Sequence, residues 1–255
     1  MIAARLVRLA AALVLMTACL AWAAPPARAQ GGDVALILRA AWGAQRLDAL
    51  QKIHTLRLHG VVTVAGIPGT ADNWKDVRDG RYAVYADSGA ISGAQGFDGA
   101  HAWHRDPRGL VSDDGSVQAH YVALDHAYLN RYLLWTPGHG GATVTSNGQK
   151  VVNGRRYDTL QITPPGSLPF ELWIDAVSHL PARTIVTVGM SSAVTTFSDY
   201  RSVKELLVPF AQQTTFKGEV STFVVTHVDV DDPGAAAALE RPASNIAALP
   251  EPDSV

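Results

Sequence analysis

A period of two runs through Leu56-Arg57-Leu58-His59-Gly60-Val61-Val62-Thr63-Val64. Its even-numbered residues are apolar or glycine, and successive side chains of a strand point to opposite faces. One face of this strand is therefore predicted to meet an apolar interior and the other to meet water. Several later segments alternate in the same way, which predicts a protein built mainly from half-buried strands.

Turn residues separate the predicted strands along the whole chain. Ile67-Pro68-Gly69 is predicted as one turn, and Asp79-Gly80 predicts a hairpin between strands near 74–77 and 81–85. Further strands are expected at 100–105, 143–145 with 150–152, 156–163, 169–175, 182–188, 193–200, 207–216 and 220–230. Strands joined by short turns pair antiparallel, and a sheet of about ten such strands tends to curl.

Two longer helices are predicted beside these strands. Asp33 is a good N-cap for a helix that runs to about Lys52. The segment 116–134 lacks Pro and Gly and repeats apolar residues at three- and four-residue spacing. A short alanine-rich helix is expected after Asp232-Pro233. The predicted fold class is α+β: a curved antiparallel sheet of about ten strands forming a half-open β-barrel, with the N-terminal and central helices on its concave face.

The first 29 residues have the pattern of an export signal. Arg5 and Arg8 form a positive region, an apolar stretch covers 9–24, and Ala27-Arg28-Ala29 is a small-x-small cleavage site. Cleavage after Ala29 predicts a periplasmic or secreted protein without a transmembrane segment in the mature chain. The alternative is a lipoprotein anchored at Cys19, because Met16-Thr17-Ala18-Cys19 loosely resembles a lipobox.

Composition limits the domain organisation and the partners. We expect one domain over 30–241, after the signal 1–29 and before a flexible tail over 242–255. Loss of the signal removes three of the 21 basic residues and none of the 23 acidic ones, so the formal charge changes from −2 to −5. This acidic balance argues against nucleic acid as a partner. The single cysteine, Cys19, lies in the signal, so no disulfide is expected.

Three short motifs suggest chemistry, and each has a simpler explanation. Asp87-Ser88-Gly89-Ala90 matches the aspartic protease string, but no second copy occurs, so a turn is predicted. His139-Gly140-Gly141-Ala142 resembles a lipase oxyanion loop, but the chain has no Gly-x-Ser-x-Gly elbow. The histidine pairs, such as His101 with His104, are spaced so that they point to opposite faces. We therefore predict no catalytic residue, no metal site and no cofactor.

Three hairpin motifs occur in a characteristic order. They are Gly96-Phe97-Asp98-Gly99-Ala100-His101-Ala102-Trp103, then Leu172-Trp173-Ile174-Asp175 followed by His179-Leu180-Pro181-Ala182-Arg183, then Phe197-Ser198-Asp199-Tyr200-Arg201-Ser202-Val203 followed by Leu207-Val208-Pro209. In this order they resemble the LolA/LolB lipoprotein-carrier superfamily. Domains of this type also stand ahead of retropepsin-like protease domains in secreted bacterial proteins. One departure is Glu205-Leu206, where the third motif usually has a glycine.

The resemblance implies a binding protein rather than an enzyme. It implies an envelope carrier for acyl chains or lipoprotein lipid moieties, held in an apolar cavity between the sheet and its helices. The cavity candidates, each of which could equally be ordinary core, are Leu56, Leu58, Val62, Val64, Tyr121, Leu124, Tyr128, Phe170, Leu172 and Ile174. The alternatives are a module that binds or regulates an envelope protein, such as a protease, and a secreted hydrolase with an unrecognised site.

Overall fold

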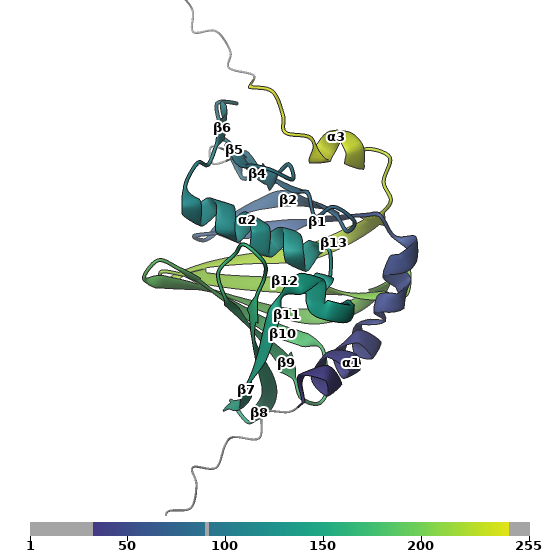
Figure 1. Ribbon diagram of the computed structural model, residues 1–255. Coiled ribbons are helices and arrows are strands. Elements are labelled where there is room, and N and C mark those ends of the chain that lie inside the picture. Colours follow the sequence, from purple (N-terminus) through teal and green to yellow (C-terminus); the bar gives the residue numbers. More distant parts are fainter. Residues whose placement is uncertain (1–32, 90–91, 245–255) are drawn as a thin grey trace, which may run out of the picture. The chain divides into compact units, whose positions relative to one another are not determined.

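Thirteen strands form one antiparallel sheet in the computed structural model, which describes residues 33–89 and 92–244 (Figure 1). The strands are β1 (Thr55–Val64), β2 (Ile67–Asp76), β3 (Tyr82–Asp87), β4 (Gly93–Phe97), β5 (Ala102–Arg105), β6 (Val111–Asp113), β7 (Thr143–Val152), β8 (Arg155–Thr163), β9 (Phe170–Asp175), β10 (Pro181–Val188), β11 (Ser191–Val203), β12 (Leu206–Phe216) and β13 (Glu219–Val230). Their order across the sheet is β6-β5-β4-β3-β2-β1-β13-β12-β11-β10-β9-β8-β7.

This order explains how a helix comes to cover the sheet. β6 and β7 follow one another in the chain but form the two opposite edges. The segment between them must therefore cross from one edge to the other, and it carries helix α2 (Val117–Asn130). The sheet curves around α2, as predicted (Figure 1). Its two edges do not pair within the described residues, so the sheet stays open.

The strand count is higher than the predicted ten, for identifiable reasons. β4 and β6 were not expected, because β4 is rich in Gly and Ala and β6 is very short. Gly96 of β4 lies under the indole of Trp103, where an added Cβ would be 2.6 Å from the ring carbon Cζ2. The predicted turn at 67–69 belongs to β2, since the actual turn is at Ala65-Gly66. The two predicted pieces at 143–145 and 150–152 are one strand, β7, with a bulge near Gly148.

The predicted helices exist but end earlier than expected. Asp33 caps α1 (Val34–Gln45) by accepting a hydrogen bond from the amide of Ala35 at 2.9 Å. Arg46 then takes a left-handed conformation, and the chain continues as the 3-10 helix η1 (Leu47–Lys52). Likewise α2 stops at Asn130, and the segment up to 141 forms the 3-10 turns η3 (Leu133–Trp135) and η4 (Pro137–Gly141). The predicted alanine-rich helix is α3 (Ala235–Leu239).

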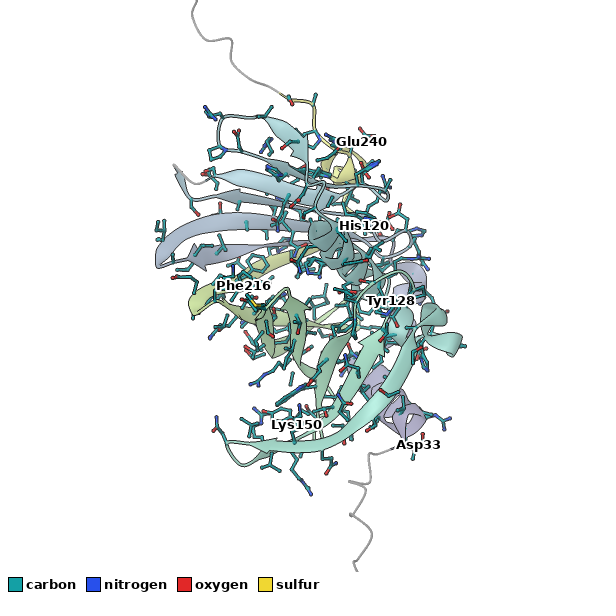
Figure 2. The ribbon with its side chains drawn as sticks, turned by 60° about the vertical axis from the view of Figure 1, so that its left-hand side comes forward. Asp33, His120, Tyr128, Lys150, Phe216 and Glu240 are labelled. Carbon is teal, nitrogen blue, oxygen red and sulfur yellow. The ribbon has the colours of Figure 1, made fainter. Side chains whose placement is uncertain are left out.

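Two apolar clusters hold the helices on the sheet. Ile37, Leu38 and Ala41 of α1 pack with the buried side chains of β8 and β9. Tyr128 of α2, labelled in Figure 2, joins this cluster. Its ring packs edge-on against Phe170, and its hydroxyl donates a hydrogen bond to the carbonyl of His139 at 2.9 Å. The second cluster places Leu47 of η1 over buried side chains of β1 and β12. Both helices are thus attached to the sheet through buried apolar side chains.

The Asp175 carboxylate shapes one of the hairpins that motivated the superfamily resemblance. Its Oδ1 accepts hydrogen bonds from the amides of Val177 and Ser178 at 3.0 and 2.8 Å, and Oδ2 pairs with Arg155 at 3.0 Å. These contacts lower the pKa of this buried carboxyl although burial alone would raise it. Asp175 therefore determines the turn from β9 to β10, an Asx-type turn.

The predicted export signal and most of the predicted tail lie outside the described residues. At the beginning of that tail, the Ser244 hydroxyl accepts a hydrogen bond from the amide of Val111 at 3.1 Å, which ties residue 244 to the edge strand β6. Within residues 33–89 and 92–244, no helix is both long enough and apolar enough to cross a bilayer.

Candidate functional site

Two rows of side chains face one another inside the curved sheet. Residues directly opposite on paired strands share a face. On β2, β3 and β4 this rule aligns Asn73, Val84 and Gln95. On the other half of the sheet it aligns Leu172 of β9, Thr184 of β10, Thr195 of β11 and Thr214 of β12. Both rows line a hollow of about 330 Å³, which is called the central hollow below.

The central hollow is covered by α2 and the turn that follows it. His126, Leu129 and Asn130 of α2 contribute to its lining, as do Tyr132 and Trp135. Tyr132 lies beyond the end of α2 in a left-handed conformation, which directs the chain into the turn η3. The cover therefore consists of one helix and a tight turn, placed there by the crossing from β6 to β7.

The lining of the central hollow is mixed, whereas an apolar cavity was expected. Asn, Gln, Thr, Tyr, His and Lys side chains make up more than half of it. The apolar part includes Leu129, Leu172 and Phe197. Such a lining suits an amphiphile, because apolar walls can shield a chain while buried polar groups need hydrogen-bonding partners.

Two side chains that can carry a positive charge, Lys75 of β2 and His126 of α2, face the central hollow. Burial lowers the pKa of Lys75 to about 8. The ring of His126 has accessible surface because it faces the hollow, but the surrounding protein and the charge of Lys75 lower its pKa to about 4. At neutral pH His126 is therefore uncharged and Lys75 is mostly protonated.

Three tyrosines complete the polar lining. The ring of Tyr82 meets that of His126 edge-on, with 5.4 Å between centroids. Tyr200 donates a hydrogen bond to the carbonyl oxygen of Pro181 at 2.7 Å. Burial raises the pKa of Tyr132 to about 12 and also raises the pKa of Tyr82 and Tyr200. All three phenols are thus neutral hydrogen-bonding groups over the whole physiological range.

The ten predicted cavity residues are distributed over several environments. Leu172 lines the central hollow, and Tyr121 lines a separate hollow of about 580 Å³ near the start of α2. The others pack in apolar clusters or lie toward the surface. Leu56 and Leu58 are 1% exposed and lie under η1. Tyr128, Phe170 and Ile174 are buried in the same cluster as Leu172, and Leu124 packs on the cluster that contains Tyr82 and Phe97. Val62 is half-buried, and Val64 is 43% exposed. Ligand contact by any of the ten stays a prediction.

The polar residues of the central hollow were missed because they occur in a segment without clear alternation. Lys75 and Asn73 pair with Leu56 and Leu58 of β1, and therefore lie on the same face as those leucines. Correct placement of the turn at Ala65-Gly66 would have revealed this pairing from the sequence. His126 is not among the residues that the sequence predicted to line a cavity. Its position over the hollow depends on how α2 crosses the sheet.

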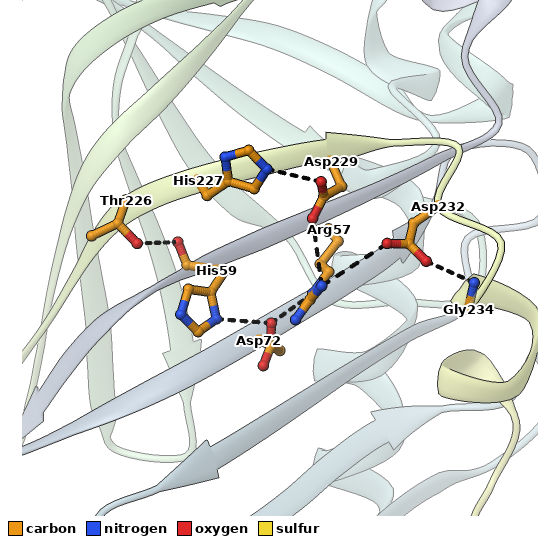
Figure 3. Close-up of polar contacts among 8 residues, drawn as sticks. All are labelled: Arg57, His59, Asp72, Thr226, His227, Asp229, Asp232 and Gly234. Atoms are coloured by element: carbon orange, nitrogen blue, oxygen red, sulfur yellow. Dashed lines mark hydrogen bonds and ion pairs between the residues drawn. The ribbon is translucent and has the colours of Figure 1, made fainter.

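A second polar cluster lies on the opposite face of β1, β2 and β13 (Figure 3). Arg57 donates to Asp72 at 2.7 Å and also pairs with Asp229 at 3.5 Å and Asp232 at 3.9 Å. The Nδ1 atom of His59 lies 3.0 Å from the same carboxylate oxygen of Asp72. The Arg57 guanidinium also stacks on Trp74 at 4.9 Å. These half-exposed ion pairs join the first strand to the last, which is a structural role.

The motifs that suggested chemistry form turns and surface contacts. The Asp87 carboxylate accepts hydrogen bonds from the Gly89 amide at 3.1 Å and from the Ser92 hydroxyl at 2.6 Å, as expected of a turn. Ser112 lies 3.1 Å from the His104 ring on the exposed edge strands, and no acidic side chain bonds His104 within the described residues. In that same part of the chain no group of His, Cys, Asp or Glu is placed to hold a metal ion.

Similarity to known proteins is found at the level of structure. No protein-family model and no curated protein sequence matches this chain. A DUF1329 family protein from Desulfovibrio piger has a TM-score of 0.57 at 13% identity, over 83% of this chain and 99% of that one. A domain assigned to outer-membrane lipoprotein sorting, from Vibrio parahaemolyticus, has a TM-score of 0.53 at 11% identity, over 79% of this chain and 94% of that one.

A LolA superfamily protein from Nitrosomonas europaea has a TM-score of 0.51 at 12% identity, over 79% of this chain and 94% of that one. These matches cover nearly the whole length of each solved structure, so the likeness concerns the complete sheet with its helices. At such low identity it is a likeness of fold. This chain therefore has the LolA-like fold that its three hairpin motifs predicted.

Proposed function

We propose that this protein is an envelope carrier or binding protein for a ligand with an acyl chain, held in the central hollow. The observation that carries this proposal is the hollow itself: about 330 Å³ of space between two rows of sheet residues and the covering helix α2. That volume lies at the small end of the roughly 300–1,000 Å³ typical of small-molecule sites, which suits a single chain. The export signal predicted in residues 1–29 is the reason for proposing the envelope.

The binding energy would come mainly from the chain. Each buried methylene contributes about 0.8 kcal/mol, so a chain with about ten of them gains roughly 8 kcal/mol before the costs of association. Loading and release need α2 or the turn after it to move away from the sheet. Gly138, His139 and Gly140 of that turn all have positive φ angles, and a few such residues can form a hinge.

A pair of neighbouring threonines tests the proposal. Thr195→Trp places an indole in the central hollow, because Thr195 belongs to the row that lines it. Thr196→Trp is the matched control, since the next residue of a strand points to the opposite face. We expect Thr195→Trp to weaken binding of lauric acid at least about tenfold, as extra volume in a filled site is poorly tolerated. The control should keep the wild-type affinity.

The measurement is titration calorimetry on delipidated protein, preceded by native mass spectrometry of protein purified from its own periplasm. A co-purifying acyl species lost in Thr195→Trp and kept in Thr196→Trp supports the proposal. Protein that carries no lipid and binds neither fatty acids nor phospholipids contradicts it, and would leave the protein-partner module as the function to test. Equal affinity of the two variants for lauric acid would show that the ligand binds outside the central hollow.

A further inference from the structure

Lys75 occupies an unusual place for a lysine. It lies on β2 with its neighbours Leu56 on β1 and Tyr82 on β3, so its stem starts on the face that the helices cover. Its side chain is half-buried and lines the central hollow. Lysine ammonium groups normally lie in bulk water, and an ammonium that is partly withdrawn from water is stabilised by a partner of opposite charge.

The described residues provide no opposite charge for this ammonium. The residues that line the central hollow include no Asp, Glu or Arg. Within residues 33–89 and 92–244, Lys75 makes no ion pair, although lysines elsewhere do, as Lys150 pairs with Glu171 at 3.1 Å. The hollow therefore holds one excess positive charge with polar neutral groups around it. An anion that enters the hollow would remove the cost of this unpaired charge.

We propose that Lys75 binds the anionic head group of the acyl-chain ligand, a carboxylate or a phosphate, inside the central hollow. This inference rests on the proposed carrier function and adds the class of head group. Asn73, Gln95 and His126 line the same hollow and can offer neutral hydrogen bonds beside the ammonium. The apolar residues Leu172 and Phe197 lie on the other half of the sheet, so the chain of the ligand has an apolar wall to pack on.

The test compares ligands that differ only in the head group: lauric acid, lauryl phosphate and lauryl alcohol. A hydrogen bond to a charged group in a site of this kind is worth about tenfold to a hundredfold in affinity. The wild-type protein is expected to prefer the two anions over the alcohol by at least about tenfold. The anion that the wild-type protein binds with the higher affinity then shows whether the natural head group is a carboxylate or a phosphate.

Three variants assign the preference to Lys75. Lys75→Met keeps the length of the side chain without its charge, and is expected to bind the acid and the alcohol equally. Lys75→Arg keeps the charge and should keep the preference. Lys52→Met changes an exposed lysine of η1 and should behave as wild type. Circular dichroism and thermal melting check that each variant is folded, and the alcohol, which needs no charge, reports an intact hollow in Lys75→Met.

A pH series provides a second readout. The ionisable groups that face Lys75 are His126 from α2, Tyr82 from β3, Tyr132 from the turn after α2 and Tyr200 from β11. Only Lys75, with its pKa of about 8, titrates between pH 7 and pH 9. Affinity for lauric acid should therefore fall about tenfold over this range in the wild type and stay constant in Lys75→Arg.

The outcomes separate the two proposals. Equal affinity of the wild type for the acid, the phosphate and the alcohol overturns the role of Lys75 and leaves the carrier function standing. A preference for anions that persists in Lys75→Met also overturns it. Binding of none of the three ligands to the wild type overturns both proposals together. Inorganic phosphate serves as the probe without a chain, and its failure to compete would confirm that the chain is required.

Discussion

Replacement of Gly60 by alanine is expected to lower the free energy of unfolding by about 3 kcal/mol. Gly60 lies in the middle of β1, between Ala71 of β2 and Val225 of β13. A Cβ at this position would overlap the carbonyl oxygen of Val224 and would lie 2.9 Å from the Cα of Val225. Since these are backbone atoms, the sheet itself would have to shift.

The matched control is Gly43→Ala in α1. Gly43 is an exposed helical residue, and an added Cβ there meets no atom within 4 Å. Alanine in a helix is favoured over glycine by about 0.5–1 kcal/mol, so this variant should be slightly more stable than the wild type. Urea unfolding at constant pH measures both variants. A Gly60→Ala variant as stable as the wild type would show that β1 and β13 separate easily.

Asp125→Asn is expected to stabilise the protein by about 2–3 kcal/mol at pH 7. Asp125 lies on α2 and is only 2% exposed, and its Oδ1 makes no hydrogen bond within the described residues. Burial raises its pKa from 3.8 to about 6, although the neighbouring Ser167 side chain acts in the opposite direction. At neutral pH the folded protein therefore carries a buried charge, and the amide avoids this cost.

The pH dependence distinguishes this mechanism from a general stabilising effect. Between pH 3.8 and about pH 6 the folded state keeps a proton that the unfolded chain has released, so the free energy of unfolding falls as pH rises. The difference between Asp125→Asn and the wild type should thus be smallest near pH 4 and reach its full size above pH 6. Glu219→Gln, at an exposed position, serves as the control. A difference that does not change with pH would refute the explanation.

Much of the fold could be predicted from local patterns. The alternation in β1, the helix cap at Asp33 and the Asp175 hairpin turn each depend on a few neighbouring residues. The predicted strand boundaries were wrong where turn residues and strand residues lie close together in the sequence. Ile67-Pro68-Gly69 has turn residues but is the start of β2, because the positive φ angles of Ala65 and Gly66 have already turned the chain. β4 was missed because Gly96 is needed there to make room for Trp103.

The candidate site was less predictable than the fold. Apolar strand residues were expected to line the cavity, and of these only Leu172 lies among the described residues of the central hollow. Leu56 and Leu58 alternate as a cavity wall would, but η1 covers them and makes them ordinary core. Whether an apolar face is covered by a helix or by a ligand depends on where the helix ends, and α1 ends at Gln45 rather than near Lys52.

The sequence by itself determined that this chain forms a curved antiparallel sheet with two covering helices and the LolA-like hairpins, because alternation, caps and turns act between residues close in the chain. Only the tertiary structure decided that β6 and β7 lie at opposite edges, so that α2 must cross the sheet. That crossing brings His126 over Lys75 and covers a hollow whose described lining residues carry one positive charge, on Lys75, and no negative charge. Contacts between strands and a helix far apart in sequence depend on register and curvature, which no local pattern specifies.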